Sequence, residues 1–547
     1  MPYSVFDLII HLERSQYLLP RLSRPSRRNI TSSSPRRTST SPQRYNVAAP
    51  VIAYKRFEDI PGPIKLPLMK HHEHILPRIG CYHHTVGLGL LESLRDKYGD
   101  LVRLSKTSRK RPVLYVFDPE LMKQIYESQA TEVPEWVQSP LQAQRNASGK
   151  CPMQRDEAKA VWTALQVILQ DDSLIKCFDK VFNEIAEDLT RRLGQLRHAE
   201  NALNEEFSTE IYRWSLETIG VVLFGERLGC LAGPAHVPIN DNRRPEKTSM
   251  DDDIKELCSL SQRCPSSLSP AERLVRCTLR VTDENYLVRS EGTLRQDSAM
   301  FKNALEAVDD HYRLMEYFLE NAQRNLEGGE IRSEQILIHK LRPLGDKMLP
   351  FVADAFLAGA EPLAQSAVSM CYHLSLHAAL QQRAHDELCW SRACREEGAA
   401  GGELPYITAC VREAMRLKPA TGGVVRRATE RLLLDGYEVP AGVDIVLAHG
   451  VSSKNESEWG RANSFIPERW CHDSASPLRA TRAHSFASLP YGLDCPVSGM
   501  AGRMLAKLAA NMLDKYRLEW HGPQPKLVTS GVNKLQPPYY FVLQNAS

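Results

Sequence analysis

The chain has few of the features that stabilise small or metal-dependent domains. Its 13 cysteines are scattered over 547 residues and form no C-x-x-C pair, so neither a zinc site nor a disulfide framework is indicated. No motif recurs at a fixed period, which excludes solenoids and propellers. The net charge of +3 is too small to indicate nucleic-acid binding. These absences favour a globular protein of a reducing compartment.

Acidic residues are almost missing from the first fifty residues, where Asp7 and Glu13 are the only two. The same segment contains eight arginines among many serines and threonines. An Arg-rich, Ser-rich and acid-poor segment is typical of a mitochondrial presequence, so residues 1–50 are predicted to be a disordered targeting segment. The alternative is a basic disordered tail that has no targeting function.

Long hydrophobic runs and glycine–serine linkers are also missing. The apolar run 5–10 is interrupted by Asp7 and is far shorter than the roughly 20 residues that a bilayer requires. Beyond the leader, no linker or change in composition divides the chain. Residues 51–547 are therefore predicted to form one domain.

Apolar residues recur at helical spacing through most of this domain, in 174–196, 207–224, 296–326, 333–341, 344–380 and 404–417. Short strands are predicted at 432–439 and 443–449. The expected fold class is mainly α with small β-sheets.

Three motifs follow one another in the last quarter of the chain. Glu413 and Arg416 are three residues apart in the predicted helix 404–417, so both project from one face and can form an ion pair. The run 465–470 reads F-I-P-E-R-W, and its Arg469 can extend that pair to a network of three charges. The run 486–492 reads F-A-S-L-P-Y-G. A helical E-x-x-R alone is common, but the order and spacing of all three motifs are not.

With these motifs the chain resembles the cytochrome P450 family of haem-thiolate monooxygenases. The resemblance implies the cytochrome P450 fold, haem b as the cofactor, and a structural network of Glu413, Arg416 and Arg469 beneath the haem. The proline-rich run 57–68 looks like the start of the catalytic domain in the mitochondrial branch of the family. This agrees with the predicted presequence.

The haem loop of the family reads approximately F-G-x-G-x-R-x-C-x-G-R-R-x-A, with the cysteine thiolate bound to iron and a helix just after it. In this chain the loop is lengthened. Alignment from the following helix places Met500 at the cysteine position, whereas alignment from the preceding Y-G dipeptide places Ser498 there. Cys495 is the only thiol of the loop. It is expected to be the metal ligand and a cofactor-binding residue, from an unusual position.

The resemblance also implies a central helix with the motif A-G-x-D/E-T, whose acid and alcohol relay protons. Here residues 358–362 read A-G-A-E-P, so Glu361 matches the acid and Pro362 replaces the alcohol. Proline removes a helix hydrogen bond and cannot relay a proton, so a kink without the usual relay is expected. Glu361 is the candidate catalytic proton donor, and an acid with no such role is the alternative.

One expected partner of the haem propionates is present. Arg426 lies ten residues beyond Arg416, where the family has an arginine that pairs with a propionate, so it is expected to bind the cofactor. The family also has a tryptophan and an arginine four residues apart in an earlier helix. Ala158 and Trp162 occupy those places here, so one expected pair of contacts is missing.

The resemblance implies hydroxylation of an apolar sterol-like or steroid-like substrate, as in arthropod members that make moulting steroids. The chain has no flavin or nucleotide motif, so its electrons must come from outside. The mitochondrial branch takes them from a small acidic iron–sulfur ferredoxin served by an NADPH reductase. Arg412, Lys418 and Lys507 are candidates for the basic patch that this partner needs. The branch also implies peripheral association with the inner membrane on its matrix side.

The departures from the family motifs leave two other functions open. One is a catalytically impaired protein that binds a sterol or a partner. The other is a haem isomerase or dehydratase, which would keep the thiolate and tolerate Pro362. The monooxygenase is the leading hypothesis.

Overall fold

The computed structural model describes residues 54–63, 88–104, 111–133, 165, 168–169, 172–203, 206–233, 268–290, 299–328, 337–396, 404–471, 477–493, 495, 497–529 and 532–546. The predicted targeting segment lies outside these residues, and its boundary at residue 50 stays a prediction. Within the described ranges, no helix combines the length and the apolar character needed to cross a membrane.

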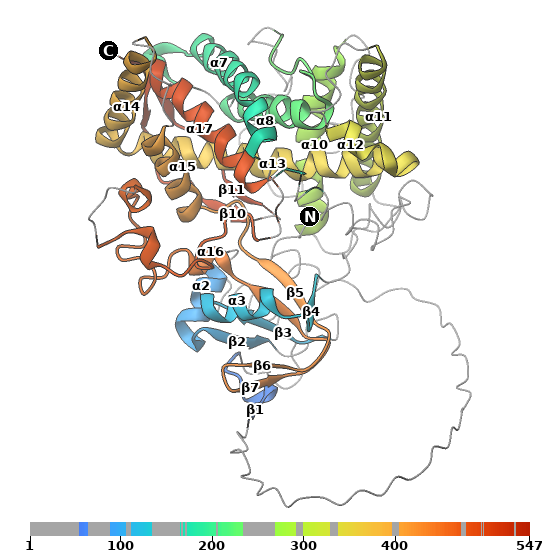
Figure 1. Ribbon diagram of the computed structural model, residues 1–547, viewed down its shortest axis with the longest axis vertical. Coiled ribbons are helices and arrows are strands. Elements are labelled where there is room, and N and C mark those ends of the chain that lie inside the picture. Colours follow the sequence, from blue (N-terminus) through green and yellow to red (C-terminus); the bar gives the residue numbers. More distant parts are fainter. Residues whose placement is uncertain are drawn as a thin grey trace, which may run out of the picture.

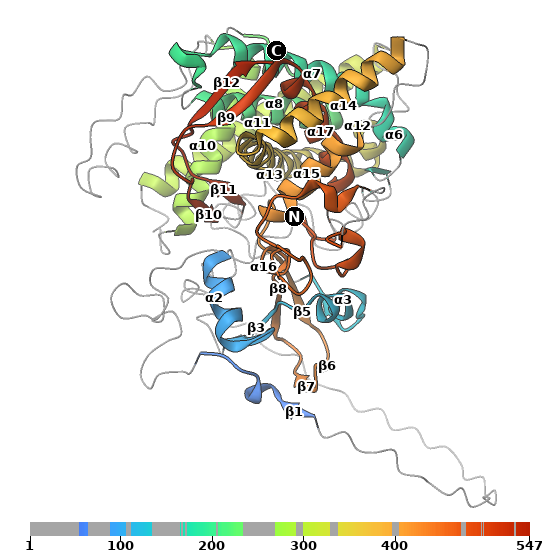
Figure 2. The same cartoon turned by 90° about the vertical axis from the view of Figure 1, so that its left-hand side faces the viewer.

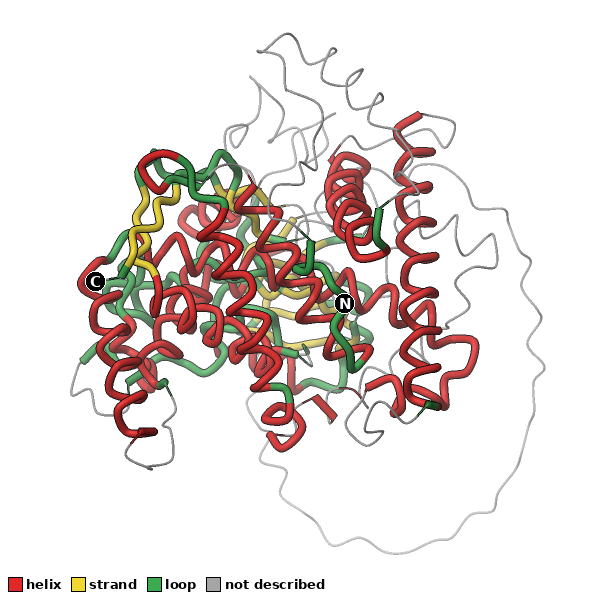
Figure 3. Tube along the Cα trace, turned by 90° about the horizontal axis from the view of Figure 1, so that it is seen from above, coloured by secondary structure: helices red, strands yellow, loops and turns green. Residues whose placement is uncertain are grey.

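Helices dominate the described chain (Figure 3), so the fold class predicted from the sequence is confirmed. The α-helices are α2 (Leu88–Tyr98), α3 (Pro119–Glu127), α6 (Asp172–Cys177), α7 (Asp179–Gln195), α8 (Glu206–Phe224), α10 (Pro270–Ser290), α11 (Ala299–Glu327), α12 (Leu337–Leu341), α13 (Met348–Ser375), α14 (Ala378–Glu396), α15 (Pro405–Leu417), α16 (His449–Ser452) and α17 (Ser498–Lys515). Short 3-10 helices are η1 (Phe57–Asp59), η3 (Ala199–Asn201), η5 (Arg342–Lys347), η6 (Pro467–Trp470) and η7 (Ala480–Arg482).

The strands of the described residues form small sheets. They are β1 (Lys55–Arg56), β2 (Leu101–Leu104), β3 (Val113–Val116), β4 (Thr131–Glu132), β5 (Val424–Ala428), β6 (Leu432–Leu434), β7 (Tyr437–Val439), β8 (Asp444–Leu447), β9 (Tyr516–Trp520), β10 (Leu527–Thr529), β11 (Asn533–Leu535) and β12 (Phe541–Asn545). The largest sheet has the order β2-β3-β8-β5-β4, and its β3 and β8 are parallel. The other sheets are β1-β7-β6 and the antiparallel pairs β9/β12 and β10/β11.

The five-stranded sheet lies below the main body of helices (Figure 1), and α2 and α3 flank it (Figure 2). Strand β3 has the sequence V-L-Y-V and is buried along its whole length. Because side chains alternate between the two faces of a strand, Val113 and Tyr115 pack in the cluster with α2, and Leu114 and Val116 pack in the cluster with α3. A strand covered on both faces needs no polar position, which explains its continuous apolar sequence.

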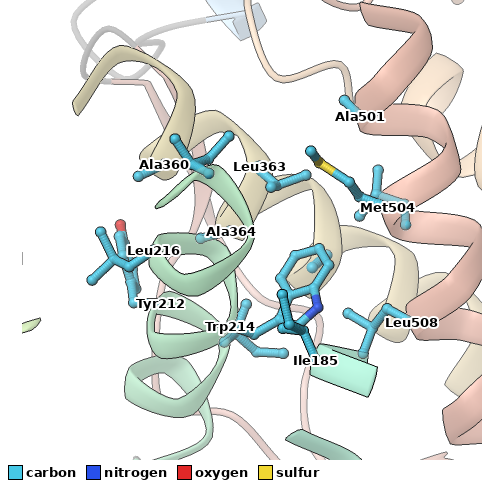
Figure 4. Packing of buried hydrophobic residues seen from close by; sticks show 14 of the residues in the cluster. Ile185, Tyr212, Trp214, Leu216, Ala360, Leu363, Ala364, Ala501, Met504 and Leu508 are labelled. Atoms are coloured by element: carbon cyan, nitrogen blue, oxygen red, sulfur yellow. The ribbon is translucent and has the colours of Figure 1, made fainter. Parts of the chain in front are cut away.

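Helix α13 forms the centre of the helical body, between α8 and α17. Figure 4 shows Trp214 of α8, Leu363 and Ala364 of α13 and Met504 of α17 in one buried cluster. From Pro362 to the end of the helix every residue is buried. Such burial places any polar side chain of this half of α13 inside the protein.

Several predicted elements have different bounds in the structure. The predicted helix 174–196 is divided into α6 and α7, and the predicted strand 443–449 ends with β8 at Leu447, before α16 begins. The predicted strand 432–439 is a hairpin of β6 and β7, because Asp435 and Gly436 have φ of 47° and 75° and reverse the chain. The predicted helix 344–380 was too long at both ends. Gly345 has a non-helical φ of 53° within η5, and a break after α13 separates it from α14.

Candidate functional site

Glu413 on α15 is the centre of a buried network of hydrogen bonds. Its carboxylate accepts bonds from Arg416 Nε at 2.9 Å and Nη2 at 2.8 Å, and from Arg469 Nε at 3.1 Å. The indole N–H of Trp470 and the backbone N–H of Ile466 donate to the same carboxylate at 2.9 and 3.1 Å. The structure therefore brings together the three charged residues that the sequence singled out, and adds Trp470.

The two arginines of this network are satisfied by backbone carbonyls. Arg416 Nη1 donates to Ser453 O at 2.7 Å, and Arg469 Nη2 donates to Arg461 O at 2.8 Å. All three charged side chains are fully buried. Burial lowers the pKa of Arg469, while the Glu413 carboxylate acts in the opposite direction. A buried network of this kind joins α15 to the segment 453–471, because each charge depends on the others for compensation.

The loop that begins with the F-A-S-L-P-Y-G motif is anchored to α13 and β5. The hydroxyl of Tyr491 lies 3.0 Å from the Ser366 hydroxyl of α13, and Thr421 N–H donates to Pro490 O at 3.2 Å. Gly492 has a φ of +75°, and a Cβ there would lie 2.6 Å from a methyl of Val424. A larger residue at this position would collide with β5, so the loop requires glycine here.

The three candidates for the iron ligand lie in different surroundings. Cys495 is 7% exposed and belongs to the same buried cluster as Tyr491 and Met500. Met500 is fully buried in the first turn of α17, and Ser498 is exposed at the first residue of that helix. Burial raises the pKa of Tyr491, and the nearby Cys495 raises it further. The two sulfur-bearing side chains therefore lie inside the protein, and the alcohol of Ser498 does not.

Glu361 lies on α13 one residue before Pro362, within a helix that continues past the proline. Its carboxylate forms an ion pair with the ammonium of Lys534 on β11, and the two side chains are 17% and 18% exposed. The Ser215 hydroxyl of α8 donates to Ala360 O at 2.6 Å. The sequence did not single out Lys534, because it lies far along the chain and outside the family motifs.

Arg426 lies on β5, with its guanidinium 5.1 Å from the centre of the Tyr126 ring. The hydroxyl oxygen of Tyr126 on α3 lies 2.9 Å from His449 Nε2, and His449 Nδ1 lies 3.3 Å from Phe486 O. Because a carbonyl only accepts, Nδ1 carries the proton and Nε2 accepts from the tyrosine. Burial lowers the pKa of His449 to about 4, so the ring is neutral near pH 7. Ala158 and Trp162 lie outside the described residues.

The three cations proposed for a basic patch are not equally accessible. Arg412 on α15 is exposed, with its guanidinium 6.0 Å from the centre of the Trp470 ring. Lys418, just after α15, is partly buried over the Tyr372 ring, and burial lowers its pKa to about 8. Lys507 on α17 is partly buried. Arg412 is the most accessible of the three.

A family model described as Cytochrome P450 matches residues 75–543. The chain therefore belongs to the cytochrome P450 family, as the sequence motifs predicted. Among similar curated proteins, "Probable cytochrome P450 49a1" of Drosophila melanogaster is 24% identical over 536 residues, 92% of this chain and 85% of that protein. "Probable cytochrome P450 301a1, mitochondrial" of the same organism is 24% identical over 510 residues, 86% of this chain and 84% of that protein.

A mammalian relative is similar over nearly the same span. "1,25-dihydroxyvitamin D(3) 24-hydroxylase, mitochondrial" of Mus musculus is 25% identical over 464 residues, 83% of this chain and 81% of that protein. These relatives are consistent with the mitochondrial, steroid-hydroxylase-like branch that the sequence resembles. Members of the family are haem-thiolate monooxygenases, so the predicted enzyme class and the haem cofactor agree with the family.

The chemistry of two side chains, Cys495 of the loop and Arg426 of β5, suits a haem. A thiol is the soft donor that such iron takes in this family, and Cys495 presents one inside the cluster that also contains α13. The cation of Arg426 suits a propionate carboxylate.

Proposed function

We propose that the chain is a mitochondrial monooxygenase that hydroxylates an apolar, sterol-like substrate with electrons from a small iron–sulfur ferredoxin. Its cofactor is held by the Cys495 thiolate at the iron and by Arg426 at a propionate. When bound, haem with a thiolate ligand supplies the activation of dioxygen. The observation that carries this proposal is the buried thiol of Cys495 beside Tyr491, in a chain of this family.

The substrate class is proposed from two features. Relatives that cover most of the chain carry names of vitamin D hydroxylases, which act on an apolar secosteroid. Residues 356–360 of α13, just before Glu361, read F-L-A-G-A and carry only apolar side chains. A flat apolar ligand suits such surroundings, because its affinity comes mainly from buried apolar area.

The compartment and the partners are proposed from the leader and the relatives. The acid-poor leader favours import into mitochondria, and the relatives with mitochondrial names point to the same organelle. The ferredoxin, its NADPH reductase and peripheral contact with the matrix side of the inner membrane follow from membership of that branch. Exposed Arg412 is the cation proposed to meet the acidic ferredoxin.

A second function is favoured by the region around Glu361. Pro362 cannot relay a proton, and Glu361 is paired with Lys534. A protein of this family that binds a sterol without oxidising it would tolerate both features. The spectrum described next and an assay of turnover separate the two functions.

The first test is the carbon-monoxide difference spectrum of the reduced protein, for the unchanged chain and for Cys495→Ser. A thiolate-type Soret band in the unchanged chain that is lost in Cys495→Ser is the expected result, because only the thiolate gives this band. Met500→Leu is the matched control, since it removes the other buried sulfur of the loop. A thiolate band that survives in Cys495→Ser would refute the ligand assignment, and absence of any haem band would refute the monooxygenase.

A further inference from the structure

Helix α13 carries a row of polar residues through an otherwise apolar environment. Glu361, Gln365, Ser369 and His373 follow one another at intervals of four residues. Residues four apart on an α-helix lie on one ridge of its surface. The residues between them are mostly small or apolar, so the row is the main polar feature of this half of the helix.

Three members of the row have polar atoms without a hydrogen-bond partner among the described residues. These atoms are Oε1 of Gln365, Oγ of Ser369 and Nε2 of His373. The side chains are buried, with exposures of 6%, 4% and 8%. The amide nitrogen of Gln365 does have a partner, since it donates to the Tyr212 hydroxyl at 3.2 Å. Buried polar atoms almost always have partners, so three on one ridge indicate a bound polar ligand.

The spacing of the row suits water. Four residues of α-helix rise by about 6 Å. A water molecule that forms hydrogen bonds of about 2.8 Å to a group on either side spans nearly that distance. One water between successive side chains would therefore satisfy the orphaned atoms, and buried waters commonly do this in proteins.

The two ends of the row lie in different surroundings. Glu361 contacts Lys534 of β11 at one end. At the other end, His373 stacks on Phe465 with ring centres 5.3 Å apart, and its carbonyl accepts a bond from Nδ1 of the partly buried His377 at 2.8 Å. Glu361 is 17% exposed and His377 is partly buried, so the row joins two partly exposed ends through the buried stretch 365–373.

The His373 ring is held in its neutral form. Burial lowers its pKa well below 6.5, and the neighbouring charges of Lys418, His377, Arg416 and Lys454 lower it further. A neutral imidazole has one nitrogen that donates and one that accepts. It can therefore take a proton on one nitrogen and release one from the other.

We propose that Gln365, Ser369 and His373 hold a file of internal water molecules along α13, and that this file carries protons from the side of His377 to Glu361. One proton enters at the His377 end and one reaches the Glu361 carboxylate, while each water exchanges one O–H bond for another. Other members of the family have an alcohol at position 362 that relays protons. Pro362 has no hydroxyl, and the water file supplies the protons in its place. The proton path rests on the proposed monooxygenase function, but the water file does not.

A crystal structure of the full chain tests the water file. In the unchanged chain, the expected result is a water oxygen within hydrogen-bond distance of both Gln365 Oε1 and Ser369 Oγ. In Ser369→Ala this water is expected to be absent. The matched control is Ser375→Ala, which removes a buried hydroxyl of α13 that already donates to Tyr372 O at 2.7 Å. A well-defined Ser369 hydroxyl without a water beside it would overturn the proposal.

The solvent isotope effect on NADPH oxidation tests the proton path, with the haem-loaded chain, a ferredoxin and its reductase. We expect Ser369→Ala to raise the isotope effect at least twofold and to release more hydrogen peroxide per NADPH, while Ser375→Ala changes neither. Equal values for the two variants would refute the path. If the unchanged chain binds no haem, the proposed function fails, and the crystal structure still decides on the water file.

Discussion

Glu413 is the residue on which the buried charges of the site depend. It compensates two guanidinium groups that have no other carboxylate in the network, and it accepts two further N–H bonds. Removing one partner of a buried ion pair costs more than the pair contributes, because the remaining charge stays buried. Removing the charge of Glu413 alone should therefore lower the free energy of unfolding strongly.

We predict that Glu413→Gln lowers the free energy of unfolding by about 3–5 kcal/mol, since the variant keeps the shape and loses the charge. Urea denaturation followed by circular dichroism measures it. The control is Glu438→Gln, which breaks an exposed ion pair with Arg431 and should cost less than about 1 kcal/mol. If Glu413→Gln does not fold, Trp470→Phe removes a single bond and should cost about 1 kcal/mol. Equal costs for Glu413→Gln and Glu438→Gln would contradict the prediction.

Between elements, the contacts of His449 join α3, α16 and the loop that leads to Tyr491. The ring accepts a bond from Tyr126 and donates one to Phe486 O, and Arg426 lies against the same tyrosine. A neutral imidazole suits both bonds. Protonation of Nε2 would turn the acceptor for Tyr126 into a donor, so acid should weaken the link.

This link predicts a dependence of stability on pH. The folded pKa of His449, about 4, lies below its ordinary value of 6.5, so between these values the unfolded chain binds more protons. The resulting stability is present above pH 6.5 and is lost as the pH falls to 4, by about 3 kcal/mol in total. Denaturation at pH 5 and 7.5 should show a smaller acid loss for His449→Gln than for the unchanged chain. His521→Gln changes an exposed histidine and should lose as much stability between pH 7.5 and pH 5 as the unchanged chain.

The bounds of the elements also show how far the sequence could predict them. Helix α15 extends over Pro405–Leu417, very near the predicted range 404–417, because one apolar face repeats at the helical period. The hairpin of β6 and β7 was missed, although Asp435 and Gly436 carried the signal of a turn. The spacing of apolar residues predicts a continuous element, and only the backbone angles of two residues interrupt it.

For the whole molecule, the position of Arg412 on the surface suggests where a charged partner binds. Its guanidinium is exposed beside Trp470, on the helix that also carries Glu413. Salt weakens an exposed charge pair, and the loss of an exposed charge acts mainly on association.

We predict that Arg412→Gln raises the KM for a ferredoxin several-fold at low salt and that high salt reduces this difference. Steady-state reduction of cytochrome c coupled to the same ferredoxin and reductase verifies that the electron supply is intact. Arg431→Gln, which neutralises an exposed arginine beside β7 of the sheet β1-β7-β6, should leave KM unchanged. A similar rise in both variants would indicate a general effect of net charge and contradict the assignment of this surface.

The sequence by itself determined the family, the fold class and the residues Glu413, Arg416 and Arg469, because these depend on local periods and on motifs of fixed order. It also named Cys495, Arg426 and Glu361 as candidates. Only the tertiary structure decided their surroundings: Trp470 on Glu413, Lys534 on Glu361, and Tyr126 with His449 beside Arg426. The intervals of the polar row on α13 can be read in the sequence, but its burial cannot. Burial and long-range contacts depend on how distant segments pack, and spacing along the chain does not encode that packing.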